Sequence, residues 1–110
     1  MSINEWTWTE NMENKIKHVR NLVEISFKDN SCHNGLSELT DSEKEHIINI
    51  GTSILCTKWG VGYEGGGFVR AFVDNDLMNA IGRADATTYK GFKFFAALVY
   101  NTAYPAELIG

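Results

Sequence analysis

The spacing of apolar residues constrains the fold of this chain more than any other feature of its sequence. In four segments these residues recur every three or four positions, which places them on one face of an α-helix. The first segment repeats Met12, Ile16, Val19, Val23 and Phe27. The alternation with a period of two that marks a half-buried strand has little support. The sequence therefore predicts an all-α protein, a compact bundle of about four helices.

Capping and turn residues set the expected ends of these helices. Thr40 and Glu43 have the spacing of a capping box, and Asp85 is a candidate N-cap three residues before Thr88. Turn-forming residues over 29–35 end the first helix.

The expected extents of the remaining helices follow from these signals. The second helix runs from Thr40 to about Gly60, and the third runs from Phe68 to about Gly82. The fourth runs from about Ala86 to Ala103, where Pro105 stops it.

Length and composition indicate a single folded domain. The chain has 110 residues, of which 44% are hydrophobic and 22% charged, a composition unlike that of disordered or fibrous proteins. We treat residues 1–110 as one helical domain. Within it, residues 1–40 form an N-terminal helix and turn, and residues 41–105 form the motif-bearing helices.

Charge and cysteine content narrow the classes of partner. The formal net charge is −4 and no basic stripe exists, so double-stranded nucleic acid is not an expected partner. No apolar stretch approaches the roughly 20 residues of a membrane span. Cys32 and Cys56 follow no secretory signal, so we expect free thiols and a cytoplasmic protein. The spacing of Cys32, His33, His46 and Cys56 matches no usual zinc pattern, so neither a metal nor a cofactor is predicted.

A glycine-rich run precedes the third predicted helix. Five of the eight residues from 60 to 67 are glycine, which no helix interior tolerates well. Gly66 and Gly67 lead directly into a helix N-terminus, where free backbone N–H groups favour a phosphate or carboxylate. Arg70, one turn further on, is placed to pair with that anion. The run lacks the Lys-Ser/Thr of a phosphate loop.

Aromatic and amide side chains near this run supply the other parts of a nucleotide pocket. Aromatic residues flank the run and are candidates to stack on a base, while Asn75 and Asn101 are candidates to bond a base edge. The candidate ligand-binding residues are Trp59, Tyr63, Gly66, Gly67, Phe68, Arg70, Asn75, Asp76, Arg83, Tyr100 and Asn101. The convincing spacing of a catalytic triad or a paired-carboxylate site is missing, so we do not expect an enzyme.

Asn75 and Asp76 stand in the middle of the third predicted helix, where their residue types are unfavourable. A partly buried carboxylate there needs partners, and Arg70, Arg83 or the 100–101 pair could supply them. The same residues are equally consistent with a structural polar latch between helices. The sequence leaves the latch and the ligand pocket as open alternatives.

The order of motifs in the second half resembles a family of short proteins encoded by phages and prophages. These proteins combine a Gly/Ser-Phe helix start, Asn-Asp-Leu, Arg-Ala-Asp, and Tyr-Asn before a proline. The matching positions here begin at Gly67-Phe68, continue through Arg83 to Asp85, and end at Tyr100-Asn101. The resemblance spans residues 47–105 and departs at Gly91, where relatives carry larger residues. The function of that family is itself not established. The resemblance therefore implies that the protein is encoded by a phage or prophage, and it implies no particular activity.

The leading hypothesis from this resemblance is a phage-encoded anti-defence protein of the infected bacterial cytoplasm. It would sequester a cyclic nucleotide or an ADP-ribose-type immune signal without cleaving it. The alternative is a protein–protein inhibitor or adaptor acting on a host enzyme. Because the segment 92–100 is apolar nearly all round, we also expect a homo-oligomer.

Overall fold

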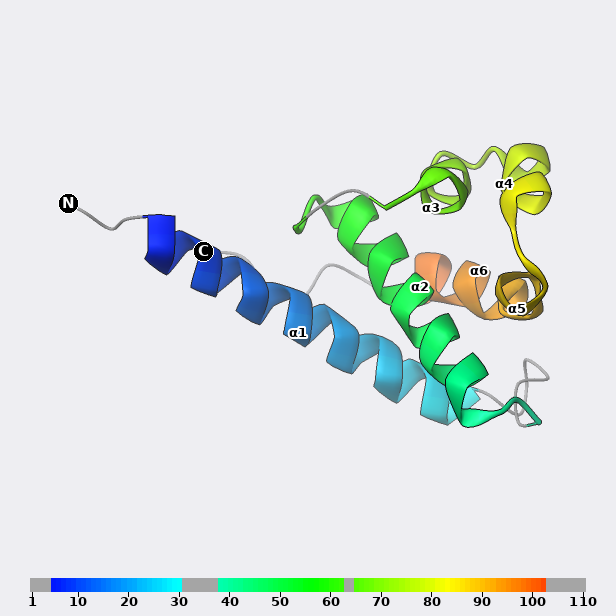
Figure 1. Ribbon diagram of the computed structural model, residues 1–110, viewed down its shortest axis with the longest axis horizontal. Helices are drawn as coiled ribbons and strands as arrows, with labels where there is room; N and C mark the ends of the chain where they lie inside the picture. The colour runs from blue at the N-terminus through cyan, green and yellow to red at the C-terminus, as the bar shows by residue number, and fades with distance from the viewer. Residues whose placement is uncertain (1–4, 31–37, 63–64, 103–110) are drawn as a thin grey trace.

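The computed structural model describes residues 5–30, 38–62 and 65–102. The helices of this part of the chain are α1 (Glu5–Asn30), α2 (Asp41–Trp59), α3 (Gly67–Val73), α4 (Leu77–Arg83), α5 (Ala86–Lys90) and α6 (Phe92–Asn101) (Figure 1). These residues contain no strand, so the all-α prediction is confirmed. The predicted number of four helices is too low for the described residues, because the third and fourth predicted helices are each divided in two.

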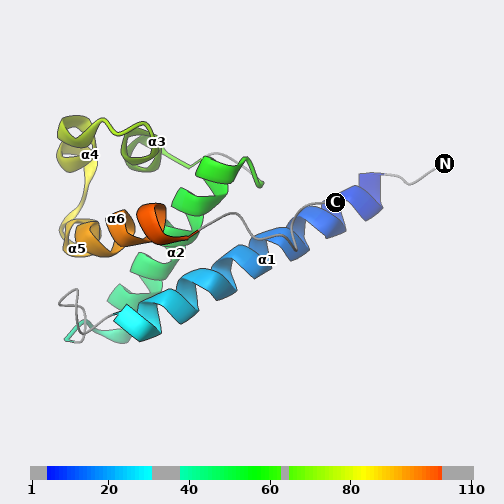
Figure 2. The ribbon, with the colours of Figure 1, turned by 180° about the vertical axis from the view of Figure 1, so that it is seen from behind.

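The two longest helices, α1 and α2, pack against each other along the faces that their apolar spacing predicts. Val19 and Val23 of α1 are fully buried, as are Ile47 and Ile54 of α2. At the edge of this contact, polar side chains also join the helices, because Arg20 donates to Glu45 across 2.7 Å. The N-terminal part of α1 extends beyond the other described helices (Figures 1 and 2).

Local sequence signals determine both ends of α2. The Thr40 hydroxyl accepts a hydrogen bond from the backbone N–H of Glu43, and the Glu43 carboxylate accepts one from the backbone N–H of Thr40. This is the predicted capping box. At the other end Gly60 adopts a left-handed φ of 68°, and its N–H bonds the last turn of the helix. Glycine takes this conformation without a steric penalty, so the helix ends where the sequence predicts.

The expectation of one continuous helix from Phe68 to Gly82 is wrong. The chain leaves the helix after Val73, turns through Asp74, Asn75 and Asp76, and resumes a helix at Leu77. Asn75 has φ 61°, a left-handed value that stops helix propagation and that asparagine adopts more readily than most residues.

The turn changes the environment of the residues beyond it. Asp76 becomes the N-cap of α4, because its Oδ1 accepts a hydrogen bond of 3.4 Å from the backbone N–H of Asn79. The apolar face expected across both halves is also divided. Val69 and Ala80 are buried, whereas Leu77 and Ile81 remain about half exposed.

The helix expected over 86–103 is divided at Gly91, between α5 and α6. Gly91 has φ −87° and ψ 2°, and its N–H bonds the carbonyl of Thr88. A Cβ at this position would lie 2.9 Å from Cζ of Phe95. The missing side chain therefore lets the aromatic ring approach the backbone at the junction. Ala103 and Pro105, the predicted end and stop of this helix, lie outside the described residues.

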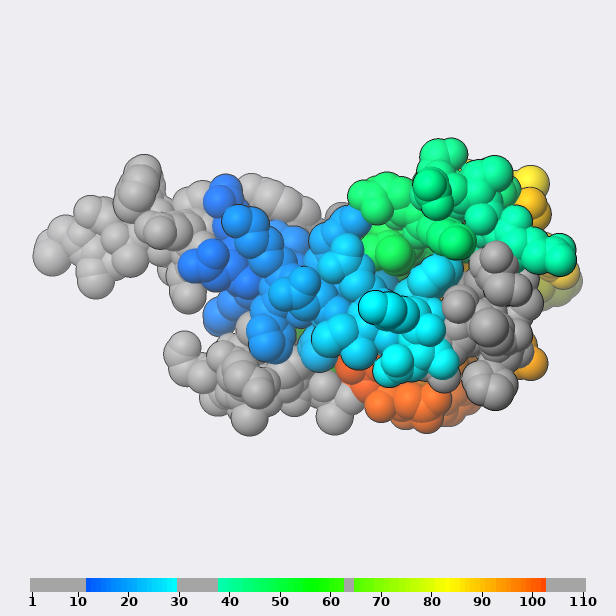
Figure 3. Space-filling view, turned by 90° about the horizontal axis from the view of Figure 1, so that it is seen from below, coloured from blue at the N-terminus to red at the C-terminus, as the bar shows by residue number. Residues whose placement is uncertain are grey.

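Aromatic rings from α3 and α6 form the centre of the core. Phe68 and Phe72 of α3 meet Phe92 and Phe95 of α6, with ring centroids 5.1–6.1 Å apart. On the other side of α6, the ring of Phe94 makes an edge-to-face contact with the ring of Phe27 in α1, with the ring centroids 5.3 Å apart. The side chains of α1 and α6 lie side by side in Figure 3.

Burial within one chain accounts for the apolar sequence of α6. Phe94, Phe95 and Leu98 are at most 1% exposed. These residues therefore need no second subunit to cover them. The reasoning that predicted a homo-oligomer from this segment therefore loses its main support.

Candidate functional site

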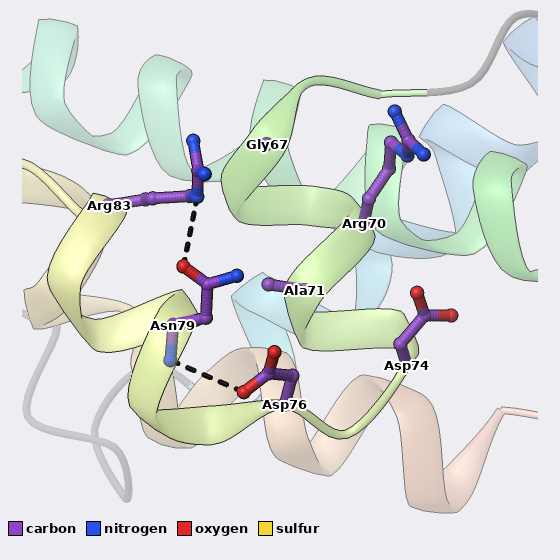
Figure 4. Close-up of a pocket in the computed structure, with 7 residues that line it drawn as sticks. All are labelled: Gly67, Arg70, Ala71, Asp74, Asp76, Asn79 and Arg83. Atoms are coloured by element: carbon purple, nitrogen blue, oxygen red, sulfur yellow. Dashed lines mark hydrogen bonds between the residues drawn. The ribbon is translucent and has the colours of Figure 1, made fainter.

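A polar pocket lies between α3 and α4, and the turn that joins them lies at one end of it (Figure 4). Its volume is about 330 Å³. The pocket is lined by Gly67, Arg70, Ala71, Asp74, Asp76, Asn79 and Arg83. Four of these residues, at positions 67, 70, 76 and 83, belong to the predicted ligand-binding set. The break between the helices creates this convergence, because α4 folds back beside α3.

The arginines stand at the end of the pocket where α3 begins. In Figure 4 the Arg83 and Arg70 side chains lie on either side of Gly67. Nε of Arg83 donates to Oδ1 of Asn79 across 3.1 Å, a bond between adjacent turns of α4 that orients the guanidinium. Nη1 of Arg83 lies beside Gly67, whose missing Cβ leaves room for it.

The carboxylates stand at the opposite end, beside the turn. Asp74 is the C-cap residue of α3, and Asp76 is the N-cap residue of α4. Oδ1 of Asp76 accepts from the backbone N–H of Asn79, which leaves Oδ2 for another donor. Because an ionised carboxylate only accepts hydrogen bonds, this end suits a ligand group rich in O–H or N–H.

Asn75 is held apart from its two neighbours by its left-handed backbone. Asp74 and Asp76 line the polar pocket, whereas Asn75 lines a second pocket of about 260 Å³ between the α3–α4 turn and α6. The other residues around the second pocket are Phe72, Val73, Leu77, Ala96, Val99 and Tyr100. Asn75 and Tyr100 therefore line the same, mainly apolar pocket. The predicted single constellation is divided between two pockets.

Of the aromatic residues predicted to stack on a base, Trp59 and Phe68 do not line the polar pocket. Phe68 is 9% exposed and lies in the aromatic core. Trp59 is partly buried and packs against the core, and Tyr63 lies outside the described residues. The role of Phe68 as a stacking platform is contradicted, because core packing already occupies its ring.

Two further candidates are placed at the borders of helices. Gly66 is the N-cap of α3 and does not line the pocket. Asn101 is the exposed last residue of α6, so it lines neither pocket. α3 is only seven residues long, so the predicted anion site at its N-terminus is weakly supported.

Ala71, Asp74 and Asn79 line the pocket but are not among the predicted ligand-binding residues. The spacing of Asn79, three residues after Asp76, is the spacing of a capped helix start. Residues 74–76 are all unfavourable within a helix. Together with this spacing, they indicate that one helix ends there and a new helix begins.

His46 forms a second polar cluster, where α2 meets α5. Its Nε2 lies 3.0 Å from Oγ1 of Thr88 and 3.5 Å from Oδ2 of Asp85. Asp85 also accepts a 2.7 Å bond from the backbone N–H of Thr88, which confirms the predicted N-cap. That bond is the main reason why the pKa of Asp85 is lowered. Because the same ring nitrogen faces both partners, the cluster lacks the relay geometry of a catalytic triad.

The described residues contain no group of three or more potential metal-ligating side chains. Within the same residues, no helix has both the length and the apolar character needed to cross a membrane. No protein-family model matches the chain, and no curated protein or solved structure is detectably similar to it. The phage resemblance therefore rests on the motifs alone.

Proposed function

We propose that this chain is a binding protein that holds a nucleotide-type ligand in the pocket between α3 and α4. The observation that carries the proposal is a single pocket that is lined by Arg70 and Arg83 toward the start of α3 and by Asp74 and Asp76 toward the turn. Guanidinium groups bind phosphate oxygens through paired hydrogen bonds, and carboxylates accept from ribose hydroxyls or base amino groups.

The dimensions of the pocket favour a small ligand or one part of a larger one. A volume of about 330 Å³ is at the low end of the range of ligand sites, about 300–1,000 Å³. One nucleotide unit is the ligand portion that we assign to it, and the rest of a larger molecule would extend over the exposed rim.

The anti-defence part of the proposal comes from the motif resemblance. Small phage proteins that resemble residues 47–105 suggest a role during infection, in the bacterial cytoplasm. There the ligand would be a cyclic nucleotide or an ADP-ribose-type immune signal, held without cleavage. The proposal requires tight binding and no turnover, so it assigns no catalytic residue.

Calorimetric titration of the purified chain with both classes of signal tests this function. After titration, the protein is denatured and the released ligand is identified by mass spectrometry. We expect to recover the intact ligand. Recovery of a cleaved product would show instead that the protein is an enzyme.

A pair of variants locates the site within the chain. Arg83→Gln should weaken binding strongly, since it removes the charge beside Gly67. Lys17→Gln removes one exposed positive charge from α1 and should leave affinity unchanged. Equal ligand affinities of the two variants would show that the ligand does not bind in this pocket.

A protein–protein inhibitor is the second candidate function, and an exposed apolar surface favours it. Met78 is 86% exposed and Tyr100 is 87% exposed, while Leu77 and Ile81 are about half exposed. Large apolar side chains grouped beside an apolar pocket are typical of interaction surfaces. If Met78→Asp abolished protection of an infecting phage and Arg83→Gln did not, this function would replace the first.

The same apolar surface is where we would expect a homo-oligomer to form. Native mass spectrometry reports the number of subunits and any retained ligand together. A mass equal to one chain would exclude assembly at the concentration used.

A further inference from the structure

The pocket between α3 and α4 is polarised, and its polarity restricts the ligand more narrowly than the proposed function does. Figure 4 shows Arg83 and Arg70 toward the start of α3, and Asp76 and Asp74 toward the α3–α4 turn. The two positive charges and the two negative charges cancel formally at neutral pH. The pocket therefore does not select a ligand for high negative charge alone.

A second anionic group would meet an unfavourable environment at the turn. If one phosphate occupies the arginine end, any further phosphate in the pocket approaches Asp74 and Asp76. Like charges repel, even where solvent screens part of the interaction. The acidic end instead favours a neutral group that donates hydrogen bonds.

The carboxylate oxygens of Asp76 are acceptors that match a pair of neighbouring hydroxyl groups. Oδ2 of Asp76 is left over after Oδ1 accepts from the backbone of Asn79. Asp74 adds a second negative charge to the lining, but Figure 4 shows its carboxylate turned away from Asp76. Carboxylates that accept from ribose hydroxyls are a recurring way for proteins to bind nucleotides. A free vicinal diol supplies two O–H donors on adjacent carbons, which suits these acceptors.

We propose that the ligand of this pocket carries a free ribose diol beside a phosphate, as ADP-ribose-type molecules do. A 3′,5′-linked cyclic nucleotide fits less well, because its 3′ oxygen is esterified and cannot donate. Arg83 holds the phosphate and Asp76 holds the diol, with Asn79 hydrogen-bonded to both residues between them. This inference rests on the proposed function, since it assumes that the pocket binds a nucleotide-type ligand.

The experiment compares four simple probes by calorimetry or by NMR titration. Adenosine 5′-monophosphate carries both the phosphate and the diol, whereas its 2′-deoxy and 3′-deoxy analogues each lack one hydroxyl. Adenosine 3′,5′-cyclic monophosphate keeps the base but has no diol. We expect the parent compound to bind best and each of the others to bind at least about tenfold more weakly, the effect of one lost hydrogen bond to a charged group.

Two variants test which end of the pocket binds the phosphate and which end binds the diol. Asp76→Asn keeps an effective N-cap for α4 and removes only the carboxylate charge, so the fold should persist. In this variant the preference for the diol should shrink to about threefold or less. Arg83→Gln should weaken the parent compound and its two deoxy analogues by similar factors, because these three carry the same phosphate monoester.

The outcomes separate the two proposals. If all four probes bind equally and binding still depends on Arg83, the diol inference is overturned and the nucleotide site stands. If the cyclic compound binds most tightly, the inference is overturned in favour of cyclic nucleotides. If no probe binds at millimolar concentration, both proposals fall.

Discussion

The guanidinium of Arg83 lies so close to the backbone of Gly67 that a Cβ at position 67 would be 2.8 Å from Nη1. Gly67→Ala should therefore displace this guanidinium while leaving its charge in place. The arginine side chain is flexible and position 67 begins α3, so we expect little change in stability. Nucleotide affinity should fall several-fold, as measured by calorimetric titration beside the wild-type chain.

Gly82→Ala is the matched control for that substitution. Nothing lies within 4 Å of a Cβ built at Gly82, which is exposed within α4. Alanine restricts the unfolded chain and suits a helix better, so we expect stabilisation by about 0.5–1 kcal/mol and unchanged affinity. Urea unfolding measures the first quantity. If both variants lost affinity equally, the contact between Gly67 and Arg83 would not explain the effect.

Gly51 lets three helices approach one another, and its replacement should be costly. A Cβ there would lie 2.9 Å from Cδ1 of Leu98 in α6 and 3.0 Å from Cγ1 of Val23 in α1. Both neighbours are buried, so neither can move away freely. We expect Gly51→Ala to be less stable than Gly82→Ala by about 1–3 kcal/mol in urea unfolding, the usual cost of overpacking. Similar stabilisation by both substitutions would show that the core has room at this crossing.

Local signals made the helix starts predictable from the sequence. The side chains of Thr40 and Asp85 bond backbone groups only three residues away, so their geometry is contained in a short window. The apolar spacing also identified the buried faces of α1 and α2. Such patterns depend on residues that are close in the sequence and not on how distant helices pack together.

The division of the predicted helices was harder to foresee. Apolar residues keep their helical spacing on both sides of Asn75 and of Gly91, so the period alone indicates continuity. The breaks become favourable when α3 and α6 bring their phenylalanines together, which is a tertiary effect. The pocket follows from the break, since only a returned α4 puts Arg83 beside Gly67. Sequence reasoning found these two residues but could not find their arrangement.

The thiol of Cys56 should react slowly in the folded protein. Burial raises the pKa of this thiol to about 11, and Cys56 is only 6% exposed to solvent. Since the thiolate is the reactive form, only about one such thiol in a thousand is ionised at pH 8. Cys32→Ser leaves Cys56 as the sole thiol for a titration with Ellman's reagent. We expect slow reaction in buffer and fast reaction in concentrated urea, and equal rates would contradict the burial of this side chain.

The acid sensitivity of the fold should depend in part on Asp85. The backbone N–H of Thr88, the side chain of Thr88 and His46 all favour the ionised carboxylate, so the pKa of Asp85 lies below its ordinary value of 3.8. A lowered pKa means that the folded state favours the charged form. The stabilisation is therefore complete above about pH 4 and is lost as the pH falls through the lower, folded value.

Two substitutions separate the charge of Asp85 from its capping role. Asp85→Ala removes the cap of α5 and should cost about 1 kcal/mol at pH 7. Asp85→Asn keeps a capping oxygen and should cost less, but it should no longer lose stability in acid through this position. Urea unfolding at pH 7 and pH 3 measures both effects, with Glu13→Ala on α1 as the matched loss of an exposed carboxylate. Because the ionised cap is worth less at pH 3, the gap between wild type and Asp85→Asn should narrow there. A gap that widened in acid would mean that the charge of Asp85 does not stabilise the junction of α2 and α5.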